Sequence, residues 1–257
     1  MTGSLRHRIA TAGIVSGLLA AGSAAAAGPS GDWQHTVFIY GMGAVIGGDA
    51  QIGPVEVSID ASMSDVFNAL EFGAMAAYRA DNGTWSFMGD ATFMGLGAYD
   101  THKKPGGGEV KGEIDVDQTT LMGTFGRRWT EHLEFLFGLA YIDLSMDLSL
   151  KDTSGGALDA AASSNVSWID PTVGLQYHRP LGEDWRATLR GDVGGFGVGS
   201  DFMYQLIASL RWQASETTGL FFGYRLIGFD YEDGHDRNYV HFDLIEQGPM
   251  VGVSLSF

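Results

Sequence analysis

The sequence contains no cysteine and only six prolines, and it has few positively charged residues. Without cysteine the protein can form no disulfide bond, use no thiol as a nucleophile and bind no zinc through sulfur. The 15 lysines and arginines are outnumbered by 31 acidic residues, and the formal net charge is −16. A nucleic-acid-binding protein needs a basic face to meet phosphates, so the composition argues against nucleic acid as a partner.

A long apolar run is also missing after the N-terminal segment, because no stretch there approaches the roughly 18 residues of a membrane-spanning helix. The N-terminal segment itself has Arg6 and Arg8, then the short apolar run Ile9–Ala21, then the small residues GSAAAAG. This order is typical of a secretory signal peptide, and a retained helical anchor is the less favoured alternative. We therefore expect a cleaved signal peptide over residues 1–27 and a single exported domain over residues 28–257.

Glycine and alternating hydrophobicity are what the sequence does contain in excess. There are 38 glycines in 257 residues, which is about twice the ordinary share of about 7 %. Apolar and polar residues alternate with period two, as in 202–213, where one parity holds Phe202, Tyr204, Leu206, Ala208, Leu210 and Trp212. The other parity in this segment is mostly polar. This period indicates β-strands, and the chain is expected to be all-β.

The spacing of the connections favours a membrane barrel over a soluble β-sandwich. Short connections alternate with long ones, the long ones being 48–70, 100–109, 151–164, 196–200 and 232–237. This layout predicts an antiparallel up-and-down transmembrane β-barrel with short turns in the periplasm and long loops outside. We expect about ten strands, with eight or twelve possible, at 34–47, 71–80, 84–99, 110–127, 133–150, 165–179, 184–195, 201–213, 219–231 and 238–257.

Aromatic residues gather near the ends of these expected strands, as in the two girdles of a membrane barrel. The short-turn ends carry Trp33, Trp85, Trp129, Trp185 and Trp212. The opposite ends carry Trp168, Tyr99, Tyr204, Tyr231 and Tyr239.

The last strand places Val251, Val253, Leu255 and the terminal Phe257 on one parity. A final strand that ends in phenylalanine resembles the assembly signal of bacterial outer-membrane barrels. The mature chain, and Arg190–Gln205 in particular, resembles poorly characterised small outer-membrane β-barrel proteins. The resemblance implies an outer-membrane location, contact with membrane lipid and lipopolysaccharide, and recognition of Phe257 by the barrel-assembly machinery. It implies no catalytic residue, and it leaves the oligomeric state open.

Assigning the polar parity to the inside of the barrel predicts a charged lumen. The residues placed there are Glu71, Arg79, Asp90, Asp170, Arg190, Asp192, Arg211 and Arg225. These charges could line a conduit for a small solute, or they could form a salt-bridged, mostly closed core.

The first long loop contains a helical pattern in which Met63, Val66, Phe67 and Leu70 fall on one face. Ser62 and Asp65 have the spacing of a capping pair. A helix this short must pack on something. It is a candidate plug or gate in the barrel mouth, and the alternative is a structural helix that rests on the rim.

Catalytic and metal-binding motifs are weak. The glycines from Gly191 to Gly199 do not have nucleotide-binding spacing. Acids and histidines in two outer loops (Asp100 and His102; Asp230, Asp233, His235 and Asp236) and a possible Ser–His pair at His241 match enzymes or calcium sites in composition alone. No cofactor or metal is expected. The prediction is a non-enzymatic outer-membrane barrel, either structural or a narrow or gated passage for small solutes. The alternatives are a barrel whose acidic outer loops bind a ligand, cation or partner, and, third, an omptin-like or lipid-modifying enzyme.

Overall fold

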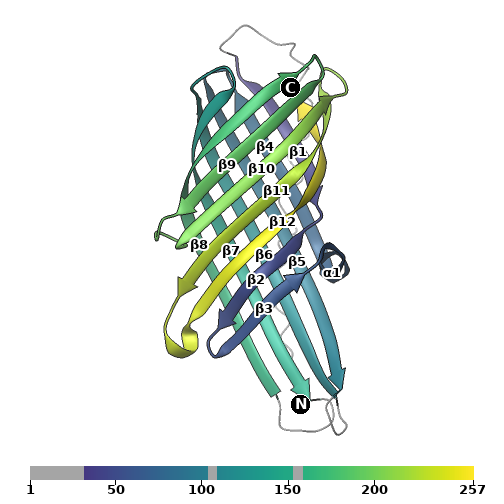
Figure 1. The fold of residues 1–257 in the computed structure, drawn as a ribbon, viewed down its shortest axis with the longest axis vertical. Coiled ribbons are helices and arrows are strands. Elements are labelled where there is room, and N and C mark those ends of the chain that lie inside the picture. The colour runs from purple at the N-terminus through teal and green to yellow at the C-terminus, as the bar shows by residue number, and fades with distance from the viewer. Residues whose placement is uncertain (1–31, 104–108, 153–158) are drawn as a thin grey trace.

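A computed structural model describes residues 32–103, 109–152 and 159–257, so the expected signal peptide lies outside the described residues. Ten antiparallel strands close into a barrel through the pairing of the first strand with the last (Figure 1). The prediction of about ten strands in an all-β up-and-down barrel is confirmed. The strands are β1 (Gln34–Met42), β4 (Leu70–Asp81), β5 (Trp85–Lys103), β6 (Glu109–Arg128), β7 (Leu133–Asp152), β8 (Asp159–Leu181), β9 (Trp185–Gly195), β10 (Phe202–Gln213), β11 (Thr218–Asp233) and β12 (Val240–Ser256).

The two ends of the barrel differ in their connections. Tight turns follow β4, β6, β8 and β10, and Phe257 lies at the same end, which we call the turn end and which is at the top of Figure 1. At the opposite end, the loop end, β5 to β8 extend well beyond β9 and β10. None of the helices within 32–103, 109–152 and 159–257 is long and apolar enough to cross a membrane.

The segment 48–70 is more ordered than the sequence predicted. It contributes most of a hairpin of β2 (Val45–Ile52) and β3 (Val55–Ala61), followed by a helix, α1 (Met63–Ala69). Strand β12 pairs with β1 through Met250–Ser256 and with β2 through Val240–Gln247, so β2 prolongs the line of β1. The hairpin was missed because Gly47 and Gly48 interrupt the alternation. Gly48 has a φ of 132° and lies against the backbone carbonyl of Asp243, where a side chain would not fit.

Toward the loop end the barrel becomes two facing sheets. Pairing of β4 with β5 stops at Leu70 and Leu96, and pairing of β9 with β8 begins at Thr172 and Gly194. Beyond these points β5–β8 form one sheet, and β11, β12, β2 and β3 form the other. Between the sheets, Trp168 of β8 stacks on Tyr231 of β11 with ring centroids 4.1 Å apart. The remaining core includes Ala50, Ile142, Leu144, Met146, Met203, Ile227, Phe229, Phe242 and Leu244.

The polarity of the two strand faces reverses along the barrel axis, as β7 shows. Its outward side chains change from Phe135, Phe137 and Leu139 to Asp143, Ser145 and Asp147 toward the loop end. Its inward side chains change from Glu134 to the buried Ile142, Leu144 and Met146. The expectation of a polar interior therefore holds for the turn half and is wrong for the loop half. This reversal is typical of a barrel whose outer face meets lipid along one half and water along the other.

The girdle prediction is correct at the turn end and partly wrong at the loop end. Trp33, Trp129, Trp185 and Trp212 are all substantially exposed, and Trp85 stacks outward on Phe125. Trp168 and Tyr231, however, point inward into the apolar core. In the loop half the interior of the barrel is apolar, so aromatic side chains that point inward there become part of the core.

Phe242 is fully buried between the two sheets. Replacing Phe242 with alanine leaves a cavity in this core, and we expect a loss of about 3–5 kcal/mol in the free energy of unfolding. Urea unfolding of the refolded barrel measures it, with Phe242→Leu as the milder control. A loss below 1 kcal/mol for Phe242→Ala would contradict a packed core.

Candidate functional site

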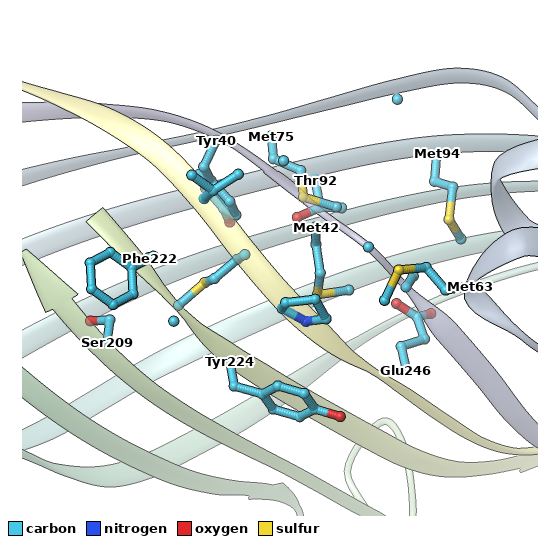
Figure 2. A pocket seen from close by; sticks show the side chains of 18 of the residues that line it. Tyr40, Met42, Met63, Met75, Thr92, Met94, Ser209, Phe222, Tyr224 and Glu246 are labelled. Atoms are coloured by element: carbon cyan, nitrogen blue, oxygen red, sulfur yellow. The ribbon is translucent and has the colours of Figure 1, made fainter. Parts of the chain in front are cut away.

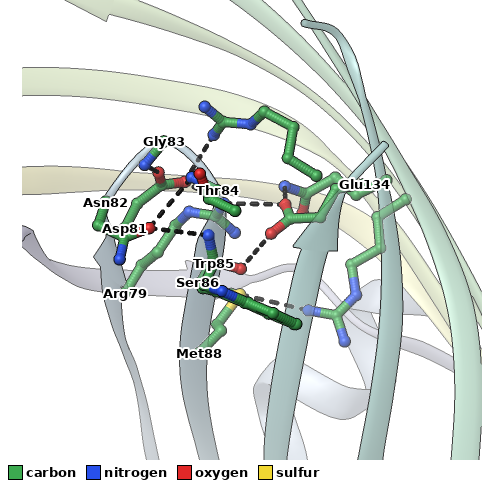
Figure 3. A network of polar contacts seen from close by, with 12 residues as sticks. Arg79, Asp81, Asn82, Gly83, Thr84, Trp85, Ser86, Met88 and Glu134 are labelled. Atoms are coloured by element: carbon green, nitrogen blue, oxygen red, sulfur yellow. Dashed lines mark hydrogen bonds and ion pairs between the residues drawn. The ribbon is translucent and has the colours of Figure 1, made fainter. Parts of the chain in front are cut away.

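A network of ion pairs lies in the lumen at the turn end (Figure 3). Arg79 of β4 donates to Glu134 of β7 at 2.9 Å and to Asp81 at 2.6 Å, and Arg128 of β6 donates to Asp81 at 2.8 Å. Glu134 is almost fully buried and also accepts from Ser86 and Gln176. These contacts cross the lumen between strands far apart in the sequence, and they fix the spacing of β4, β6 and β7.

Two further arginines lie deeper in the lumen. Arg190 donates from Nε to Asp192 at 2.7 Å, and it also contacts Thr124 and the sulfur of Met88. Arg225 donates from Nη1 to Asp90 at 3.2 Å and to the Tyr40 hydroxyl at 3.0 Å. Both arginines are buried. A buried charge is tolerated only when it is paired and hydrogen-bonded, and these two are.

Arg211 also lies in the lumen, but its hydrogen-bond partners are neutral side chains. Its guanidinium donates to Gln213 and to Ser256, and within the described residues it forms no salt bridge. Directly opposite, on β9, the register places Arg186. Arg186 points to the same inward face because it shares the parity of Arg190.

Asp170 and Glu71 are not members of this network. Asp170 is fully buried but accepts from Trp168 Nε1 at 3.0 Å and from the backbone and hydroxyl of Ser200 at 2.7 Å each. It fastens the connection between β9 and β10 onto β8. Glu71 is exposed on the outer surface, with its carboxylate over Gly97 and near Asp115. The prediction that Glu71 lies in the lumen is therefore wrong. The strand register shifts between Leu70 and Phe72, so the alternation that places Arg79 inside does not hold at Glu71.

Helix α1 begins with a reciprocal capping box between Ser62 and Asp65, as the sequence predicted. It lies against β2, β3 and β5, in the gap between β3 and β5 where the described residues form no strand pairing. Val66 is buried against Ala44, Ile46 and Met94. Phe67 and Leu70 are 56 % and 39 % exposed. The helix thus forms part of the wall at the edge of the apolar belt and does not lie across the mouth.

Beside α1 is a recess of about 1060 Å³. Figure 2 shows Met42, Met63, Met75 and Met94 around it, with Thr92 and Glu246 among them. The lining also includes side chains on the lipid-facing side, such as Phe93 and Val251, so the recess is open and not an enclosed chamber. Thioethers are flexible and apolar, which suits such a surface to irregular hydrocarbon contacts. Sequence reasoning missed the recess because its methionines, which also include Met250, come from five separated segments.

Of the acid and histidine residues considered for catalysis, the structure brings one pair together. His241 lies 3.1 Å from Asp230 on the outer surface, and Tyr239 donates to Glu232 beside them. The side chains of Asp100 and His102 lie outside what the structure describes. Within 32–103, 109–152 and 159–257, no group of three or more histidines and acids is arranged to hold a metal ion.

Comparison with solved structures identifies the architecture. The translocator domain of the autotransporter NalP from Neisseria meningitidis superposes with a TM-score of 0.51 and 15 % identity, covering 88 % of this chain and 89 % of that one. The chain has the fold of an outer-membrane β-barrel. Ail, the attachment invasion locus protein of Yersinia pestis, is also similar, with a TM-score of 0.37 and 10 % identity over 89 % of this chain and all of the other. No protein-family model and no curated protein matches the sequence.

The pairing of Arg190 with Asp192 can be tested directly in this barrel. Asp192→Leu removes the carboxylate and leaves a buried guanidinium without its counter-charge, so we expect the free energy of unfolding to fall by about 3–5 kcal/mol. Asp184→Asn, in the exposed turn before β9, is the matched control and should stay within about 0.5 kcal/mol. Equal unfolding midpoints for Asp192→Leu and the wild type would mean that Asp192 is hydrated.

Proposed function

We propose that the protein is a closed, non-enzymatic structural barrel of the outer membrane that carries a rigid two-sheet extension beyond the lipid. The observation that supports this most is the apolar core of the loop half. Ala140, Ile142, Leu144 and Phe242 are each at most 1 % exposed. An ion that crossed this packed apolar core would lose most of its hydration, which is costly.

The turn half supports the same proposal over a passage for solutes. Its lumen contains ion pairs between strands that are not neighbours in the barrel, such as Arg79 of β4 with Glu134 of β7 and Arg225 of β11 with Asp90 of β5. A conducting path would have to displace these pairs and then cross the apolar core. The two barriers lie in series along the axis, so opening one would leave the other in place.

The extension keeps a hydrated, acidic outer surface. Glu71, Glu113, Asp117 and Asp147 surround Asp115 there, and partial desolvation together with their negative charge raises the pKa of Asp115. Charged side chains on the outer face cannot enter the hydrocarbon, so they set the depth at which the barrel sits. Ligand or partner binding at the acidic outer loops would use this same end of the molecule.

Planar-bilayer recording tests closure. The refolded wild-type barrel should give no resolved single-channel steps under conditions in which an open porin does. Phe67→Asp should also give none, because Phe67 is exposed on the wall and does not block a pore. Regular steps from the wild type would contradict a closed lumen, and steps from Phe67→Asp alone would show that α1 gates one.

Epitope insertion tests the direction in which the extension points. A tag after Gly234, in the connection at the loop end, should be bound by antibody on intact cells. A tag after Asn82, in the turn between β4 and β5, should be bound only after the outer membrane is permeabilised. The opposite pattern would reverse the proposed orientation while leaving the barrel itself unchallenged.

A further inference from the structure

Positive charge is concentrated inside the turn half of this acidic protein. A space of about 160 Å³ lies in the lumen there, and its lining includes His178 and Tyr40. Six arginines from five strands line the same space, namely Arg79, Arg128, Arg186, Arg190, Arg211 and Arg225. The chain as a whole has a net charge of −16, so this gathering is opposite in sign to its average.

The carboxylates of the lumen pair with four of these six arginines. Asp81 and Glu134 neutralise Arg79 and Arg128, Asp192 pairs with Arg190, and Asp90 pairs with Arg225. Within the described residues, no salt bridge reaches Arg186 or Arg211. The lumen therefore contains a surplus of positive charge at a defined place.

The two unneutralised arginines are neighbours. Arg186 and Arg211 are directly opposite each other in the ladder between β9 and β10, both on the inward face. Like charges at directly opposed positions of a sheet destabilise it. Arg211 Nε, Arg128 Nε and Arg225 Nε are moreover buried without an acceptor among the described residues. The space thus has more hydrogen-bond donors than the protein supplies acceptors for.

Burial is graded from the turn end inward. Arg186 is exposed and Arg211 half-buried, whereas Arg190 and Arg225 are only 4 % exposed. A solute in the water at the turn end can therefore reach Arg186 and Arg211. The apolar core of the loop half closes the other end, so the space is a vestibule and not a channel.

We propose that this vestibule is a binding site for a small water-soluble phosphate, either inorganic phosphate or a compact phosphomonoester, held between Arg186 and Arg211. Guanidinium groups bind tetrahedral oxyanions through paired N–H donors, which a spherical halide cannot match. A dianion placed here neutralises the two opposed charges and accepts from donors that have no partner. The small volume excludes large nucleotides.

Thermal unfolding and calorimetric titration with inorganic phosphate test the proposal, using the refolded full-length mature barrel at constant ionic strength maintained with potassium chloride. Phosphate should bind saturably and raise the unfolding temperature, because a ligand that binds the folded state stabilises it. Chloride over the same range should give no saturable effect. Arg186→Gln and Arg211→Gln should each weaken phosphate binding at least tenfold.

Two controls separate a binding role from a structural one. Arg179→Gln removes an exposed arginine on the outer face of the neighbouring strand β8 and should bind phosphate like the wild type. Without phosphate, Arg186→Gln should unfold at the same or a higher temperature than the wild type, since it relieves the repulsion with Arg211. Arg211→Lys keeps the positive charge but loses the paired N–H donors of the guanidinium. Its affinity for phosphate should lie between those of the wild type and Arg211→Gln.

Several outcomes would overturn the site. These are the absence of saturable phosphate binding by the wild type, equal responses to phosphate and chloride, or an equal loss of binding in Arg179→Gln. Bilayer conductance is a separate measurement, so a conducting barrel that still binds phosphate would refute closure and leave this site standing.

Discussion

The backbone of a strand in the membrane must find its hydrogen-bond partners on neighbouring strands, because the hydrocarbon offers none. Here one strand, β12, satisfies this requirement on the closing side: it pairs with β11 on one edge and with β1 and then β2 on the other. Strand β1 ends at Met42, and β2 begins at Val45 and continues the pairing with β12. The chain then turns back as β3, which pairs with β2 outside the closed barrel. The two-sheet extension and the gap that α1 fills both follow from this interrupted closure.

The reversal of polarity along the strands divides the molecule into two halves with opposite solvents. In the turn half the apolar side chains face lipid, and the interior is held by charge pairs such as Arg190 with Asp192. In the loop half the outer face meets water, and the interior is an ordinary hydrophobic core around Phe242. The proposed closure of the lumen therefore depends on different chemistry in each half and does not depend on α1.

The distribution of charge adds a second asymmetry. Acidic residues are gathered on the outside of the extension, while many of the arginines point into the lumen. Arginine suits that interior because its planar donors bind several acceptors at once and its charge is not lost on burial. A surplus left at Arg186 and Arg211 faces the open turn end, whereas the deeper arginines are each matched by a carboxylate.

The sequence by itself predicted the all-β barrel of about ten strands, the short turns and the capped helix, because period-two alternation and turn spacing are local properties. It missed the hairpin of β2 and β3. It also placed Arg79, Asp90, Arg190, Asp192, Arg211 and Arg225 in the lumen through parity alone. The tertiary structure decided which of these arginines have partners, since Arg225 and Asp90 are 135 residues apart and meet only because the barrel closes. It also decided that Trp168 and Tyr231 point into the core and that Glu71 lies on the outer surface. Parity states which side of a strand a residue occupies, but what that side touches, whether lipid, water or the opposite wall, depends on its height along the axis.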